Sequence, residues 1–85
     1  MEEEVVVKIN TPTIKLDQFL KWTGTVQTGG EGKFIISEGL IMVNDVVQGK
    51  RGKLIKSGDR VSVMRIDQKG RREVEQVFIV DTGGE

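Results

Sequence analysis

The spacing of apolar residues changes at Gly39, and this change constrains the fold more than any other feature of the sequence. Before Gly39, apolar residues recur every three or four positions, the period of a helix with one buried face. After Gly39, they form short β-branched runs separated by Gly, Asn and Asp, which is typical of strands and turns. The sequence therefore predicts an α+β fold. Its 85 residues suffice for one small core, so we expect residues 1–85 to form a single domain.

Two helices are predicted before this change of period. The first covers residues 14–23, with Thr13 as a candidate N-cap, and the second covers 29–38. Thr28 precedes the second helix as its N-cap, and Gly39 follows its last turn. The buried face of the first helix is expected to contain Leu16, Phe19 and Leu20. Asp17 is assigned a structural role, because an acid in the first turn stabilises the helix dipole.

Strands are predicted at both ends of the chain and around the helices. They cover residues 5–9, 40–43, 46–47, 60–66 and 74–80. Asn44 and Asp45 form the tight turn of a hairpin, and 67–72 form a second hairpin loop around Gly70. The predicted fold is thus two helices packed on a small antiparallel sheet, with an added N-terminal strand and a C-terminal hairpin strand. The tail 81–85 is expected to be loose.

The residue types exclude most enzyme chemistry. The chain has no Cys and no His, so it lacks a thiol nucleophile, an imidazole base and a zinc ligand set. We therefore expect no catalytic residues, no cofactor and no metal. No apolar run reaches the roughly 20 residues that span a bilayer, and residues 1–4 are acidic where a signal peptide is basic. These features predict a cytosolic protein without a membrane partner.

Charge is segregated along a chain whose net charge is zero. Residues 46–72 carry a local net charge of +7, whereas 1–45 carry −3 and 73–85 carry −4. A folded domain with one basic face is expected to show such segregation, and that face would attract phosphates. The alternative is a solvated strand-and-turn surface, which also produces charge runs.

Two basic constellations are candidate phosphate sites. The first is the turn into the second helix, where unpaired amides and the helix dipole favour an anion; it comprises Gln27, Thr28, Gly29, Gly30 and Lys33. The second comprises Lys50, Arg51, Lys53 and Lys56, where glycines allow close approach and Arg provides a planar fork. The alternatives are a sharp reversal between packed helices and a solvated loop. A nucleotide-binding P-loop is excluded, since Gln27 replaces its first Gly and Phe34 its Ser or Thr.

Four aromatic residues are too few for recognition of stacked bases over an aromatic sheet. Phe19 and Phe78 are expected in the core, and Trp22 and Phe34 are expected to pack under loops. Recognition of folded RNA by its shape and its phosphates fits this composition better.

The order of these parts resembles the S4-type RNA-binding domain over residues 13–65. The family has a basic residue before Leu-Asp in helix one, which corresponds to residues 15–17 here. It also has a Val-Asn-Gly hairpin, which corresponds to residues 39–47, and a Gly-Asp turn into a strand, which corresponds to residues 57–63. Segments 27–30 and 51–54 look like the small stand-alone bacterial members of the YaaA and YbcJ type. Residues 67–85 extend beyond this core.

The resemblance implies one RNA-binding surface made of the two helices and the basic loop, with ribosomal RNA or a ribosomal subunit as partner. Lys15 joins the site residues because it occupies the basic position before Leu-Asp. Three departures are visible: Lys15 replaces the usual Arg, Thr28 and Gly29 replace a Ser-Arg pair, and Asp45 replaces the Gly of the turn.

Two other functions are compatible with parts of the sequence. Gly83 and Gly84 resemble the Gly-Gly terminus of ubiquitin-like sulfur carriers, but Glu85 follows them, and only one strand precedes the first helix. A protein-binding module is the third hypothesis.

Overall fold

The computed structural model describes residues 4–82, and within them it contains two helices and seven strands. In chain order these are β1 (Glu4–Lys8), β2 (Thr13–Lys15), α1 (Leu16–Trp22), α2 (Gly29–Ser37), β3 (Ile41–Val43), β4 (Val46–Val47), β5 (Leu54–Lys56), β6 (Arg60–Ile66) and β7 (Arg72–Asp81). The α+β prediction is confirmed.

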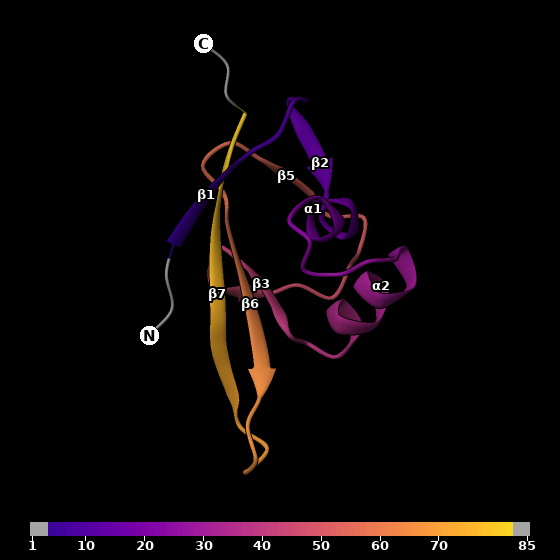
Figure 1. The fold of residues 1–85 in the computed structure, drawn as a ribbon, viewed down its shortest axis with the longest axis vertical. Helices are drawn as coiled ribbons and strands as arrows, with labels where there is room; N and C mark the ends of the chain where they lie inside the picture. Colours follow the sequence, from indigo (N-terminus) through magenta and orange to yellow (C-terminus); the bar gives the residue numbers. More distant parts are fainter. Residues whose placement is uncertain (1–3, 83–85) are drawn as a thin grey trace.

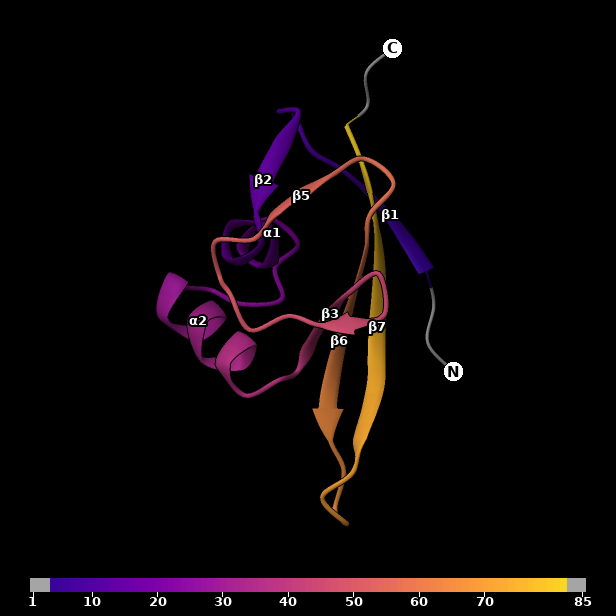
Figure 2. The same cartoon turned by 180° about the vertical axis from the view of Figure 1, so that it is seen from behind.

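The strands form a five-stranded sheet in the order β1-β7-β6-β3-β4 and a separate two-stranded ribbon of β2 and β5. Both helices lie on one side of the long β6–β7 hairpin (Figures 1 and 2). The added N-terminal strand β1 pairs parallel with β7, whereas the other pairs are antiparallel, so the five-stranded sheet is mixed. The hairpin follows the 44 Å long axis, and its tip projects away from the helices (Figure 1).

Helix α1 begins two residues later than predicted, and Thr13 is not its cap. Thr13 and Ile14 belong to β2, because Ile14 pairs with Ile55 of β5 and places its side chain against the core. Lys15 is the N-cap residue, and no side chain caps the helix. The apolar spacing identified the helix. It could not reveal that the residues just before the helix pair with a strand far away in the sequence.

Helix α2 and its boundaries agree with the prediction. Thr28 is the N-cap, and its Oγ1 accepts a hydrogen bond from the Glu31 amide at 3.1 Å. Gly39 follows the helix with φ at +76°, a conformation that L side chains rarely adopt. Both ends of this helix were therefore readable from local chemistry.

The predicted turn of the first hairpin is also confirmed. Asn44 and Asp45 have φ values of 53° and 70°, as a two-residue type I′ turn requires. The Asn44 side chain also joins this turn to β6, because its Oδ1 accepts from the Arg60 amide at 2.9 Å. Its Nδ2 donates to Asp59 Oδ1 at 3.1 Å.

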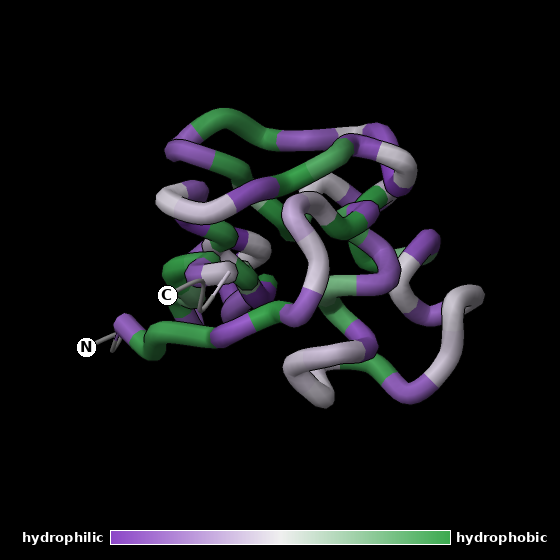
Figure 3. Tube along the Cα trace, turned by 90° about the horizontal axis from the view of Figure 1, so that it is seen from above, coloured by the Kyte–Doolittle hydropathy of each residue, from purple (hydrophilic) through white to green (hydrophobic). Residues whose placement is uncertain are grey.

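The core lies between the helices and the inner face of the sheet. Hydrophobic and hydrophilic stretches alternate along much of the chain (Figure 3), as expected when one face of each element is buried. Phe19 is fully buried and meets the partly buried Phe78 edge to face, with ring centroids 6.0 Å apart. The largest fully buried side chains are Phe19, Leu16, Leu20, Ile36, Ile41, Ile55, Val61 and Val80.

The prediction that Trp22 and Phe34 pack under loops is wrong. They remain 51% and 61% exposed, since each points away from the apolar face of its helix. The Trp22 indole nitrogen donates to the Lys8 carbonyl at 2.9 Å.

The C-terminal tail differs in part from the prediction. Asp81 ends β7, and its carbonyl accepts from the Ile9 amide at 2.8 Å, so it is not loose. Residues 83–85, and with them the Gly-Gly pair, lie outside the described residues.

Candidate nucleic-acid interface

The predicted phosphate-binding residues fall on four connected pieces of the chain. Lys15 lies at the junction of β2 and α1, Gln27 and Thr28 directly precede α2, and Gly29, Gly30 and Lys33 lie within α2. Residues 50–53 form the connection between β4 and β5, and Lys56 ends β5. All six predicted cations are exposed.

Backbone hydrogen bonds hold the basic segment 50–53 against the start of α1. The amides of Leu16 and Asp17 donate to the carbonyl oxygens of Lys53 and Arg51, at 2.8 and 3.2 Å. These bonds satisfy donors that every helix leaves unpaired at its N-terminus. Because they use only the backbone of Arg51 and Lys53, both side chains stay exposed to solvent.

The β2–β5 ribbon brings two further cations to one face. Lys15 lies opposite Leu54, and Thr13 lies opposite Lys56, while Ile14 and Ile55 between them face the core. Residues opposite each other on paired strands share a face, and neighbours alternate. Lys15 and Lys56 therefore project from the same exposed side of the ribbon.

Helix α2 packs closely beside this arrangement. A Cβ built on Gly32 would lie 3.6 Å from the Asp17 Cβ and 3.6 Å from Val26 Cγ2, so Gly32 lies against the first turn of α1. Lys33 follows Gly32 directly. The connection between β4 and β5 runs past both helices (Figures 1 and 2). The structure thus brings the two predicted basic constellations to neighbouring positions around the start of α1.

Asp17 occupies the first turn of α1, where the sequence placed it. It is buried, and its Oδ1 has no hydrogen-bond partner among the described residues. Its position between the Arg51 carbonyl and Gly32 makes it a packing residue at the helix junction.

Ion pairs occupy several of the cations, but most of those in the candidate site lie outside such pairs. Arg60, Arg65 and Arg71 pair with Glu4, Asp67 or Glu73 at 2.7 to 3.4 Å. Lys56 lies 3.7 Å from Asp59. Within residues 4–82, no carboxylate lies at ion-pair distance from the remaining cations of the site; these are Lys15, Lys33, Lys50, Arg51 and Lys53. Within the described residues, Asp59 therefore offsets part of the positive charge at Lys56 and Lys53, and Lys15, Lys33, Lys50 and Arg51 have no carboxylate at ion-pair distance.

Asp59 is a structural acid at the edge of this surface. Burial alone would raise its pKa, but hydrogen bonds from the Lys56 amide and the Asn44 side chain, together with the charges of Lys56 and Lys53, lower the pKa below 3.8. The Lys56 amide donates to Asp59 Oδ2 at 2.9 Å. Asp59 therefore remains ionised at neutral pH. Its hydrogen bond from Asn44 links the turn at Gly58 and Asp59 to the β3–β4 hairpin.

The turn into α2 contains an acid that the sequence interpretation missed. The Gln27 amide donates to Glu31 Oε1 at 2.7 Å, so Thr28 and Glu31 form a variant of the capping box in which the carboxylate accepts from the residue before the N-cap. The spacing Thr-x-x-Glu was the available signal. The Glu31 carboxylate offsets part of the helix dipole. Binding of an anion at the start of α2 would therefore depend on Lys33 and on the first-turn amides of Gly29 and Gly30.

Across residues 4–82, no group of three or more acidic side chains is arranged to hold a metal ion. Neither of the two helices there is long and apolar enough to cross a membrane.

Comparison with known proteins identifies a family and a similar protein. The family model described as S4 domain matches residues 7–69. The chain is 39% identical over 57 residues to a Bacillus subtilis (strain 168) protein named "Probable ribosome maturation protein RlbA", an alignment that covers 67% of this chain and 80% of the relative. The family resemblance seen in the sequence is confirmed, and the chain belongs to the S4 domain family.

Proposed function

We propose that this protein is a non-catalytic RNA-binding protein that recognises structured ribosomal RNA through its phosphates. The observation that carries the proposal is the gathering of five exposed cations around the start of α1, none of which lies at ion-pair distance from a carboxylate of residues 4–82. Membership in the S4 domain family supports RNA as the ligand. The name of the Bacillus subtilis relative supports ribosome maturation as the setting.

Each part of the surface has a distinct role in this proposal. Arg51 offers a planar fork that pairs with two phosphate oxygens, whereas lysines act as point charges. Lys15 and Lys56 extend the positive surface along the β2–β5 ribbon. Lys33, Gly29 and Gly30 would hold a phosphate at the start of α2, assisted by the Thr28 hydroxyl and the Gln27 side chain.

Shape and phosphate recognition suit the surface better than recognition of bases. A-form RNA displays its phosphates and 2′-hydroxyls across a shallow minor groove, and a rigid array of cations matches that display. The rigidity comes from the backbone bonds that fasten residues 51 and 53 to α1. We infer that double-stranded or folded RNA binds more tightly than unstructured RNA.

The experiment compares folded ribosomal RNA fragments with unstructured RNA of equal length, using electrophoretic mobility shift. We expect stronger binding to the folded fragments and crosslinks in cells that concentrate on ribosomal RNA. Lack of RNA binding at low salt would contradict the proposal. Turnover of RNA by the purified protein, abolished by changing one acid, would contradict its non-catalytic part.

The sulfur-carrier hypothesis has a separate test. A carrier would lose Glu85 and form a thiocarboxylate or an adenylate at Gly84, which mass spectrometry of the purified protein detects. We propose that Glu85 is retained.

A further inference from the structure

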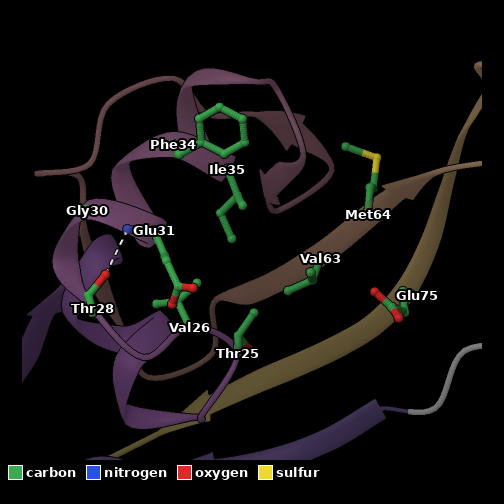
Figure 4. A pocket seen from close by; sticks show the side chains of 10 residues that line it. All are labelled: Thr25, Val26, Thr28, Gly30, Glu31, Phe34, Ile35, Val63, Met64 and Glu75. Atoms are coloured by element: carbon green, nitrogen blue, oxygen red, sulfur yellow. Dashed lines mark hydrogen bonds between the residues drawn. The ribbon is translucent and has the colours of Figure 1, made fainter.

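A groove opens between α2 and the β6–β7 hairpin, with a volume of about 580 Å³. Helix α2 forms one wall, and the strands form the other (Figure 4). The residues that give the groove its chemistry are Glu31, Phe34, Ile35, Val63, Met64 and Glu75. Val63 and Met64 form an apolar floor, which the sequence pattern did not reveal as a site.

Phe34 is the aromatic group of this groove. It is 61% exposed although it is one of only four aromatic residues in the chain. An aromatic ring left in water forgoes the free energy of burial, so exposed rings often mark binding surfaces. The ring lies at the helix wall, opposite Met64 and Glu75 (Figure 4).

A β-bulge places Glu75 in the groove. Val63 lies opposite Gln76 and Met64 lies opposite Val74, so Glu75 is the additional residue of β7 and has no partner in register. Bulges reorient side chains, and this one turns Glu75 toward α2 (Figure 4). Among the described residues, no cation and no hydrogen-bond donor contacts the exposed Glu75 carboxylate.

A second carboxylate lies on the opposite wall. Glu31 Oε1 accepts from the Gln27 amide at 2.7 Å, which fixes the side chain beside Val26 (Figure 4). The lining contains no Lys and no Arg. The groove therefore combines two negative charges, an exposed ring and an apolar floor, and it repels phosphates.

We propose that this groove binds the arginine side chains of a basic segment of a partner protein. A guanidinium is planar, stacks on an aromatic face and donates paired hydrogen bonds to a carboxylate. Phe34 and Glu75 offer these two partners on opposite walls (Figure 4), so one arginine stacks on the ring while another pairs with the carboxylate, and the apolar floor accepts their methylene stems. Charge complementarity favours this occupant over an RNA base, since the carboxylates would also repel the base's own phosphate.

The site goes beyond the proposed RNA-binding function and adjoins it. Thr28 and Gly30 line one end of the groove and also belong to the proposed phosphate surface. A basic protein and RNA would therefore meet at the start of α2, each on a surface of opposite charge.

The test titrates the full chain, labelled with ¹⁵N, with a peptide that alternates Arg and Leu, and follows amide shifts by NMR. Shifts are expected at Phe34, Ile35 and Glu75. The same peptide with citrulline in place of Arg keeps the shape and loses the charge, so it should bind at least about threefold more weakly.

Variants assign the contacts. Glu75→Gln and Phe34→Leu should each weaken the Arg peptide about twofold to fivefold, since each removes one surface-type contact. Glu38→Gln is the matched control, because it removes an exposed charge at the end of α2 and does not line the groove. All three variants should bind paired RNA with the affinity of the parent protein. A failure of the groove proposal is therefore distinguishable from a failure of the RNA-binding proposal.

Four results would overturn the proposal. The first is that the groove amides do not shift at the highest peptide concentration, and the second is that the Arg and citrulline peptides bind equally. The third is that a hairpin RNA with one unpaired guanine shifts these amides and the peptide does not, which would make the occupant a base. The fourth is that raising the protein concentration alone produces the shifts, which would make the occupant a second copy of the chain.

Discussion

Replacing Arg51 and Lys53 by Gln gives the sharpest test of the basic surface. Both side chains are exposed, and only their carbonyl oxygens bond to α1, so the double variant should fold normally. If each cation neutralises one phosphate, the slope of log affinity against log salt should decrease in magnitude by about 1.4 to 1.8. Over a fourfold change in salt, this corresponds to roughly a 7- to 12-fold change in relative affinity.

The assay measures RNA affinity by fluorescence anisotropy across a salt series, with circular dichroism as the check on folding. The matched control replaces Lys69 and Arg71 by Gln, which also removes one Lys and one Arg. These two lie at the projecting tip of the β6–β7 hairpin (Figure 1), and Arg71 already pairs with Asp67 at 3.0 Å. We therefore expect a smaller change of slope from the control.

Equal slopes for the two double variants would refute the reasoning. Both remove the same formal charge, so a diffuse attraction between protein and RNA predicts equal losses. Unequal slopes require that the cations near α1 contact phosphates at defined positions.

Three further predictions concern stability and the assignment of Lys15. Leu16→Ala or Phe19→Ala should lower the free energy of unfolding by about 2 to 5 kcal/mol, whereas Lys15→Ala should leave stability unchanged and weaken RNA binding; denaturant melts that show the reverse would contradict the assignment. Thr28→Ala should cost about 1 kcal/mol by removing the cap of α2, and an unchanged urea midpoint would contradict that role. The lowered pKa of Asp59 stabilises the fold at pH values above the unfolded value near 3.8, and this contribution is lost as pH falls through the lower folded value. Acid titration of Asp59→Asn should show a shallower loss of stability over that window, and identical curves would exclude Asp59 as a source of acid sensitivity.

The sequence by itself determined the elements whose signals are local. Helix α2 has its cap at Thr28 and its glycine at Gly39, and each acts within one turn. Asn44 and Asp45 specify their turn because their own backbone adopts positive φ. The family motif was readable for the same reason, since its residues occur in short runs, and it indicated both the S4 domain and the cations of the candidate site.

Only the tertiary structure decided how distant segments pair. The local pattern predicted a helix from residue 14 with Thr13 as its cap, but Thr13–Lys15 pair with Leu54–Lys56 and form a strand. The parallel pairing of β1 with β7 depends on register between the two ends of the chain, which no local pattern encodes. The bulge that turns Glu75 into the groove depends on how β7 matches β6. Pairing of this kind is fixed by shared burial and by hydrogen bonds between segments, so it becomes visible only when the core is assembled.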